Sequence, residues 1–302
     1  MIVVAGVTNV ELTVPVDGFP IRYAPVRYPQ WEIGARVAGV GYGVAAALAV
    51  LGAEVRLATL VAIDPLGGMV QAVLRKRGLW GAGVASAAAT PASVVLHDPA
   101  GQRMISTDLK GLPDAEYPRS RFAGLLAGAE LAVVTNIGFA RPLLAVAAEH
   151  GVPVAADVQA VESLDDAYNA AWMRAATVLF CSHERLPCSP EDWVTGVWDR
   201  YGCELVVVGC GPAGAVLGVR DGREVYRVPG VAPRGVVNTV GAGDALAAAF
   251  LYVLTHTGDP YLALEQAVLF AGYRVGASAG EDGWLTGNEL AELHYAQRTS
   301  RT

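Results

Sequence analysis

Short apolar runs alternate with helix-like stretches through the second half of the chain, and this alternation constrains the fold more than any other feature. The runs are rich in valine, alanine and leucine. A regular strand–helix alternation indicates a parallel sheet with helices on both faces. The predicted strands are Leu131–Asn136, Val152–Val158, Thr177–Ser182 and Leu205–Cys210, and the predicted helices between them are Arg141–His150, Leu164–Arg174 and Glu191–Tyr201. The expected fold class is therefore α/β.

The first half of the chain adds strands and a helix to this pattern. Ile2–Val7 is a continuous apolar run, as expected of a buried parallel strand, and Val55–Val61 is the next such run. Gly68–Arg77 is a predicted helix. Asp64 precedes Pro65, so we interpret it as the N-cap of this helix in preference to a catalytic group.

Two regions do not fit the strand–helix pattern. Val14–Trp31 holds four prolines and several aromatic residues and is expected to form irregular strands. Ser93–His97 and Arg103–Thr107 are short β-like runs around a turn, so they predict a hairpin. Together they would form a small antiparallel lid, with segments at about 11–36 and 90–113, on a single domain spanning residues 1–302. Such a lid would exclude water from a reaction beneath it.

A glycine turn opens a long apolar helix near residue 240. The heptapeptide Asn238–Asp244 reads Asn-Thr-Val-Gly-Ala-Gly-Asp and follows an extended segment. Unpaired N–H groups at a helix N-terminus bind anions, and glycine lets an anion approach the backbone closely. Asp244 would lie beside that anion, placed to take a proton from an attacking hydroxyl group. This arrangement suits phosphoryl transfer to an alcohol; the alternative is that Asp244 merely caps a core helix.

Composition disfavours several classes of function. Hydrophobic residues make up 53% of the chain and charged residues 17%, which is typical of a globular protein with a buried sheet. A net charge of −7 offers no basic patch for nucleic acid. The apolar runs are too short or too rich in glycine to span a bilayer, and the first residues lack the basic region of a signal peptide. We therefore expect a cytoplasmic protein with neither nucleic acid nor membrane as a partner.

The heptapeptide resembles the signature of the ribokinase (PfkB) family of carbohydrate and nucleoside kinases, usually Asp-Thr-x-Gly-Ala-Gly-Asp, with Asn238 in place of the first Asp. The resemblance extends over essentially the whole chain, and its motifs occur in the same order as in the family. It implies a three-layer α/β/α sandwich with a small β lid, Asp244 as the general base, and an anion hole from the amides of Gly241, Ala242 and Gly243. It also implies ATP and Mg²⁺, a possible K⁺ ion, and a possible homodimer through the lid.

On the acceptor side, the resemblance assigns substrate hydroxyl groups to a polar pair and a glycine segment. The pair is Asn9 and Glu11, where the family has Asn-x-Asp; the alternative is that both simply begin a second strand. The segment holds Gly39, Gly41 and Gly43 before the predicted helix Val44–Leu51, and Gly43 replaces the family's Asn. One expected hydroxyl contact must then come from another residue.

On the nucleotide side, the resemblance assigns two turns and the start of the heptapeptide. Glu184 matches the Glu of the family's Asn-x-x-Glu, which organises Mg²⁺ through water, with Cys181 in place of the Asn. A solvated helix start is the alternative for Glu184. The turn with Gly209, Gly211 and Gly214 resembles the family's nucleotide turn, with Gly209 in place of Thr. Asn238, Thr239, Gly241 and Gly243 would complete the contacts to the nucleotide.

These assignments predict ATP-dependent phosphorylation of a hydroxyl group on a sugar or a related small molecule. Two alternatives remain open. One is a nucleoside kinase of the same fold, because Tyr23, Tyr28, Trp31 and Tyr42 could stack on a base or simply form the lid core. The other is a non-catalytic sugar- or nucleotide-binding regulatory protein, because the chain departs from the family pattern at positions 43, 181, 209 and 238.

Overall fold

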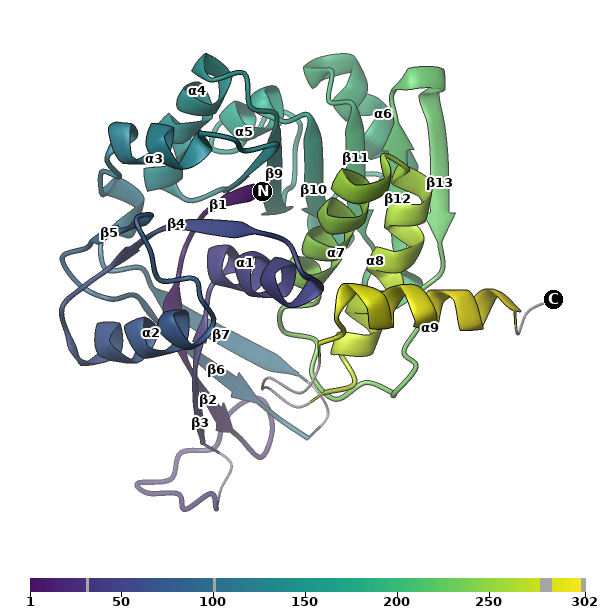
Figure 1. Ribbon diagram of the computed structural model, residues 1–302. Helices are drawn as coiled ribbons and strands as arrows, with labels where there is room; N and C mark the ends of the chain where they lie inside the picture. Colours follow the sequence, from purple (N-terminus) through teal and green to yellow (C-terminus); the bar gives the residue numbers. More distant parts are fainter. Residues whose placement is uncertain (31–32, 100–101, 278–283, 300–302) are drawn as a thin grey trace.

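A central sheet organises the molecule. The structure is a computed structural model that describes residues 1–30, 33–99, 102–277 and 284–299. Among these residues nine strands form the sheet, in the order β13-β12-β11-β10-β9-β8-β1-β4-β5 (Figure 1). The strands are β1 (Ile2–Ala5), β4 (Val55–Val61), β5 (Val84–Ser86), β8 (Leu131–Thr135), β9 (Val154–Ala160), β10 (Val178–Ser182), β11 (Leu205–Gly209), β12 (Ala215–Val219) and β13 (Glu224–Val228). Neighbours pair in parallel from β5 to β11, and β12 and β13 add an antiparallel edge.

Helices cover both faces of this sheet, which confirms the predicted α/β class. The helices are α1 (Val40–Leu51), α2 (Pro65–Lys76), α3 (Arg119–Leu126), α4 (Arg141–Glu149), α5 (Ala170–Ala175), α6 (Pro190–Tyr201), α7 (Ala242–Thr257), α8 (Pro260–Arg274) and α9 (Gly287–Thr299). Side chains of α1, α7 and α8 build one apolar core with the sheet, and those of α3 to α6 build the other. Phe250 and Trp172, both fully buried, represent the two cores.

The order in which strands are added to the sheet switches at β1, because β4 and β5 follow on one side of it and β8 and β9 on the other. The connection from β1 to β4 runs through α1, and the connection from β8 to β9 runs through α4 on the opposite face. In open α/β sheets such a switch point leaves a crevice at the carboxyl ends of the strands, where ligands bind. We therefore expect the ligand site near the residues at the carboxyl ends of β1, β8 and β9.

A second sheet lies beyond the carboxyl end of β1 (Figure 1). Its strands are β2 (Asn9–Pro15), β3 (Gly34–Ala38), β6 (Ala92–His97) and β7 (Arg103–Asp108), in the order β3-β2-β6-β7. Cα register places Glu11 opposite Arg36 and beside Ser93, and Ser93 opposite Thr107. Because side chains alternate between faces, these four residues share one face of the sheet. We call this sheet the lid.

The lid differs from the sequence prediction in two ways. We expected an antiparallel lid, but β2 and β6 pair in parallel because a long excursion of the chain separates them. We expected irregular strands in Val14–Trp31, but β2 ends at Pro15 and residues 17–30 contain no strand; Trp31 lies outside the described residues. Prolines, which cannot donate to a β ladder, explain the absence of strands.

Several helix boundaries also differ from the prediction. The helix predicted as Val44–Leu51 begins at Val40, so Gly41 and Gly43 lie in its first turn. The predicted helix Leu164–Arg174 is shortened to α5, because the residues before it form turns around Asp166. Asp64 is the N-cap of α2, as predicted, since its Oδ1 accepts from the Gly67 amide at 2.6 Å.

Helix α8 ends at Arg274, and Gly272 lies inside it without breaking it. Within the described residues, no helix combines the length and the apolar content that crossing a bilayer requires.

Candidate active site

The N-terminus of α7 is open to an anion. Gly241 is the N-cap, with a left-handed φ of 79°, and among the described residues no side chain caps the helix. The side chain of Asn238 instead accepts from the Val240 amide at 2.9 Å, which shapes the turn before the helix. The Ala242 amide donates to the Thr239 carbonyl oxygen at 3.3 Å and would exchange this weak bond for an anion. The helix dipole also favours negative charge here.

Three glycines bring α1 against the start of α7. A Cβ atom on Gly43 would lie 2.2 Å from Oδ2 of Asp244, and one on Gly41 would lie 2.4 Å from the carbonyl carbon of Gly6. Gly39 has a φ of 103°, and its Cβ would lie 2.5 Å from the Val7 carbonyl oxygen. The glycine segment thus lets the end of β1, the first turn of α1 and the Asp244 carboxylate meet.

Burial makes Asp244 a stronger base than an ordinary carboxylate. Desolvation raises the pKa of Asp244 to about 8, and the negative charge of Asp157 acts on it in the same direction. Asp157 lies within β9, opposite Thr135, the last residue of β8, and burial raises its own pKa to about 6. Its Oδ1 accepts from the amide of Gln159 at 2.8 Å, in a bulge where Gln159 has a φ of 56°. The charge of Asp157 on β9 therefore raises the pKa of a carboxylate that belongs to another element, α7.

Asn9 and Glu11 belong to the lid strand β2, which is the second of the two alternatives considered from the sequence. Nδ2 of Asn9 donates to Oγ of Ser93 at 2.7 Å, while its buried Oδ1 lies near the Cβ position of Gly39 and has no hydrogen-bond partner among the described residues. Glu11 accepts from Nε of Arg36 at 2.8 Å and also from its Nη2. Within the described residues Oδ1 of Asn9 thus keeps its acceptor capacity unused, whereas Glu11 is engaged by Arg36.

The lid contacts the heptapeptide directly. Nη1 of Arg103 on β7 donates to Oγ1 of Thr239 at 2.9 Å, joining residues 136 positions apart in the chain. Thr239 precedes the N-cap Gly241 by two residues. This hydrogen bond holds the lid over the start of α7.

The predicted nucleotide turn and Glu184 lie side by side. Ser182 at the end of β10 is in register with Gly209 at the end of β11, and Nδ1 of His183 lies 3.0 Å from the Gly209 carbonyl oxygen. Nothing in the sequence distinguishes His183 from a plain surface residue, yet it joins the two turns. Gly211 and Gly214 have left-handed φ angles of 55° and 92°, and a Cβ on Gly214 would lie 2.0 Å from the Val228 carbonyl oxygen.

Glu184 is exposed at this edge, so its carboxylate can reach a hydrated cation. The described residues contain no group of three acidic, cysteine or histidine side chains that would hold a metal by themselves. Mg²⁺ usually keeps several waters and takes its other ligands from substrate phosphates. The residues present therefore fit an Mg²⁺ ion that arrives with a nucleotide.

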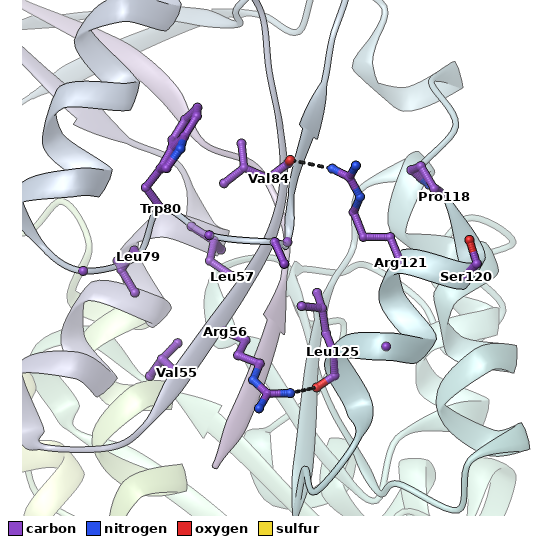
Figure 2. A pocket seen from close by; sticks show the side chains of 15 residues that line it. Val55, Arg56, Leu57, Leu79, Trp80, Val84, Pro118, Ser120, Arg121 and Leu125 are labelled. Carbon is purple, nitrogen blue, oxygen red and sulfur yellow. Dashed lines mark hydrogen bonds between the residues drawn. The ribbon is translucent and has the colours of Figure 1, made fainter.

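The cavity of about 930 Å³ drawn in Figure 2 is not this site. It opens beside Val55 and Leu57 at the amino end of β4, whereas the candidate site lies at the carboxyl ends of the strands. Two arginines line it, but Arg56 donates to the Leu125 carbonyl oxygen at 2.9 Å and Arg121 to that of Val84 at 2.6 Å (Figure 2). Both guanidinium groups are thus engaged in hydrogen bonds to the backbone.

Sequence reasoning missed two residues that the structure brings to the site. Asp157 falls within a predicted strand and was assigned no role, although a carboxylate at the carboxyl end of a parallel strand is a usable signal. Arg103 begins a run of the predicted hairpin, and its hydrogen bond to Thr239 joins segments that lie far apart in the chain. Contacts between a lid and a body depend on long-range packing that no local pattern encodes.

Comparisons with known proteins agree with this geometry. A model of the pfkB family of carbohydrate kinases matches residues 1–284. The chain is similar to an acarbose 7(IV)-phosphotransferase from Actinoplanes sp. (strain ATCC 31044 / CBS 674.73 / SE50/110), with 30% identity over 257 residues, which covers 83% of this chain and 84% of that protein.

Two solved structures show the same fold. One is a microbiome-derived acarbose kinase, Mak1, with a TM-score of 0.87 and 24% identity over 97% of this chain and 98% of that chain. The other is a ribokinase from Thermotoga maritima, with a TM-score of 0.80 and 19% identity over 98% of this chain and 99% of that chain. These matches confirm the ribokinase-like architecture expected from the sequence.

Proposed function

Because the chain belongs to the pfkB family of carbohydrate kinases, we propose that it transfers the γ-phosphoryl group of ATP to a hydroxyl group of a sugar or a related small molecule. One observation carries this proposal. The Asp244 carboxylate, whose pKa is raised to about 8, lies in the first turn of a helix with an open N-terminus, at the switch point of the sheet. A base and an anion site thus stand next to each other.

Asp244 would accept the proton of the attacking hydroxyl group. A carboxylate with a pKa near 8 holds this proton better than an ordinary one with a pKa near 4, so the transfer is less unfavourable. The amides of Gly241, Ala242 and Gly243 would stabilise the charge on the transferred group, aided by the dipole of α7. Arg103, by holding the lid on Thr239, would exclude water.

The nucleotide would lie against the turn that contains Gly209, Gly211 and Gly214, and against Asn238 and Thr239. Bound Mg²⁺ would neutralise part of the phosphate charge, and Glu184 would hold one of its waters. Whether K⁺ also acts near Asn238 is tested by exchanging KCl for NaCl in the same assay. Residues 1–302 would act as a single domain.

The acceptor would lie between the lid and the first turn of α1. Asn9, with its unpartnered Oδ1, and the backbone at Gly39, Gly41 and Gly43 are the proposed contacts, and Glu11 would act through Arg36. Two relatives are named for acarbose, so acarbose belongs in any acceptor panel. Nucleosides belong in the panel as well, because the chain also resembles the solved structure of a nucleoside kinase from Burkholderia thailandensis, with a TM-score of 0.78.

A regulatory protein is the second candidate, motivated by the departures from the family pattern at positions 43, 181, 209 and 238. Saturable binding of a sugar or nucleoside without release of ADP would favour it. Cytoplasmic localisation and homodimerisation through the lid are further expectations. Sedimentation across a range of protein concentrations tests the dimer.

The decisive experiment is ADP release with Mg-ATP across pentoses, hexoses, sugar phosphates, nucleosides and acarbose. We expect turnover of one acceptor class, with a loss of at least about 10²–10⁴-fold in kcat for Asp244→Asn, because positioned base catalysis contributes that much. Asp199→Asn is the matched control, since Asp199 forms an exposed ion pair with Arg223. Full activity of Asp244→Asn would refute the mechanism.

A further inference from the structure

The cavity drawn in Figure 2 has no part in the proposed reaction, yet its wall is positively charged. Its volume is about 930 Å³, within the range of about 300–1,000 Å³ that is usual for sites of small organic ligands. Arg56 and Arg121 line it, and none of the described residues in its wall is acidic. Because the chain as a whole carries a net charge of −7, this local excess of positive charge is not a general property of the surface.

Backbone hydrogen bonds fix each guanidinium group through one nitrogen and leave the others available. Nη1 of Arg56 donates to the carbonyl oxygens of Leu125 and Ala127, at 2.9 and 3.3 Å. Nη1 of Arg121 donates to the carbonyl oxygen of Val84 at 2.6 Å. Within the described residues neither arginine forms an ion pair, and no hydrogen bond engages Nε or Nη2 of either one. Such an edge of two N–H donors matches a carboxylate or a phosphate group.

The same short stretch of helix α3 relates the two arginines to each other. Arg121 and Leu125, whose carbonyl oxygen accepts from Arg56, lie about one turn apart on α3. A Cβ atom on Gly83 would lie 3.0 Å from Cδ1 of Leu125, and the next residue, Val84, accepts from Arg121. Contacts between α3 and the start of β5 therefore hold both guanidinium groups at the wall of one cavity (Figure 2).

The rest of the wall is largely apolar. Leu57, Leu79 and Leu125 line the cavity and are at most 5% exposed. Trp80 also lines it and is half-buried, with the guanidinium group of Arg75 5.2 Å from the centre of its ring. An apolar wall contributes nothing to the binding of a bare inorganic ion, but it stabilises the organic part of a larger ligand.

We propose that this cavity binds a small organic oxyanion, a phosphate ester or a carboxylate. Arg56 and Arg121 hold the oxyanion group through their free N–H donors, and the organic part packs against the wall formed by Leu57, Leu79 and Trp80. Both oxyanions present the same chemistry to a guanidinium group. The site is separate from Asp244 and the start of α7, so the inference does not depend on the proposed phosphoryl transfer.

The cavity lies between the two elements that flank the hairpin of the lid. Strand β5 is the strand before β6, and α3 is the first α-helix after β7. Besides the bond from Arg121 to Val84, the hydroxyl group of Tyr117 donates to the carbonyl oxygen of Gly83 at 2.6 Å. A ligand that contacts both β5 and α3 adds to these links. The bound anion would therefore hold the two ends of the β6–β7 hairpin together and slow its local opening.

Hydrogen–deuterium exchange of the whole chain, without ATP and at equal ionic strength, locates the site. The anionic probes are phenyl phosphate, benzoate and glucose 6-phosphate, and the matched neutral or inorganic probes are benzyl alcohol, glucose and inorganic phosphate. We expect at least one organic anion to slow amide exchange about tenfold in residues 79–84 and 119–127 at a hundred times its Kd, and also to slow exchange in β6 and β7. Residues 241–257 should be unaffected.

A variant that fills the cavity separates binding from folding. Gly124 lines the cavity, and a Cβ atom there meets nothing within 4 Å. Gly124→Leu should therefore fold at least as well as the wild type, since leucine favours a helix more than glycine does, and should lose the protection. Gly68→Leu in α2, where a Cβ also meets open space, is the matched control and should respond like the wild type.

Variants of the arginines test the role of charge. Arg56→Met and Arg121→Met should each raise the Kd of the anion about tenfold or more, and the double variant should abolish the protection. Arg121→Lys keeps the charge and should keep part of the response. Arg119→Met, which removes a neighbouring arginine that pairs with Glu149, should bind as the wild type does.

Four results would overturn the proposal. None of the organic anions could protect the cavity; neutral probes could protect it as well as anionic ones; inorganic phosphate could act as strongly as the organic anions, which indicates an adventitious ion only; or the protection could persist in Gly124→Leu. Protection of residues 241–257 in place of the cavity would assign the anion to the start of α7. Absence of ADP release with every acceptor would refute the proposed kinase reaction and leave this site standing.

Discussion

At the scale of single residues, the space left by Gly43 decides how Asp244 can be held. In Gly43→Ala the new methyl group would meet Oδ2 of Asp244, whose position lies 2.2 Å from the ideal Cβ. We expect a fall of about 10²-fold or more in kcat, since a base displaced by an ångström loses its alignment. Circular dichroism should show an intact fold. Gly68→Ala in α2, where a Cβ meets nothing within 4 Å, is the control and should keep full activity.

The pH dependence of the reaction depends on Asp157 as well as Asp244. The base works when Asp244 is deprotonated, so kcat/KM should rise about tenfold per pH unit below the pKa of about 8 and level off above it. Asp157→Asn removes a negative charge that raises this pKa, so the midpoint should move to lower pH. The amide can still accept from Gln159. Asp165→Asn, on an exposed ion pair with Arg200, should leave the midpoint unchanged.

Some of these residues could be predicted from sequence and others could not. Asp244 is recognisable because its role is encoded locally, by glycines and a helix start within seven positions. Asp157 and Arg103 reach the candidate site through contacts between distant segments, and nothing near them in the chain marks them. The glycine pattern indicates a close approach at Gly43, but the neighbour that approaches it is visible only in three dimensions.

At the scale of elements, the lid is held by a contact that can be removed alone. Arg103→Met deletes the hydrogen bond to Thr239. We expect a rise of roughly 2–10-fold in the KM of the acceptor, the range of one net hydrogen bond, and more ATP hydrolysis without acceptor because the lid excludes water less well.

A double-mutant cycle with Thr239→Val checks that the effect comes from this pair. The double variant should be no worse than the poorer single variant. Arg27→Met, elsewhere in the lid region and paired with Asp17, should leave both rates unchanged. Additive effects of Arg103→Met and Thr239→Val would contradict the proposed contact.

Element prediction succeeded where apolar periodicity dominates. Strands β8 to β11 are valine- and alanine-rich and lie within about two residues of their expected bounds. The start of α1 was misplaced because Gly41 and Gly43 resemble a loop, although tertiary contacts with Gly6 and Asp244 keep them helical. The short α3 was missed because its apolar residues are few, and its buried Phe122 and Leu125 become informative only once the sheet is known.

At the scale of the whole molecule, the candidate base should lower the stability of the fold. Folding raises the pKa of Asp244 from about 3.9 in the unfolded chain to about 8. Between these values the folded state binds more protons, so the free energy of unfolding falls as pH rises through this window. Below pH 4 the carboxyl group is protonated in both states and contributes nothing to this dependence.

Asp244→Asn should therefore stabilise the protein in a pH-dependent way. The variant should unfold at nearly the wild-type Tm at pH 4 and several degrees above it at pH 9. The gain is on the order of 2 kcal/mol after allowance for solvent, because the carboxylate keeps part of its surface exposed. Asp199→Asn, on the surface, should show no such trend. An equal effect of Asp244→Asn at both pH values would mean that packing, and not charge, limits stability at this position. A gain in Tm at pH 9 that is nearly absent at pH 4 would instead tie the raised pKa of Asp244 to the function. The variant that is more stable at pH 9 would then be the same variant that loses catalysis.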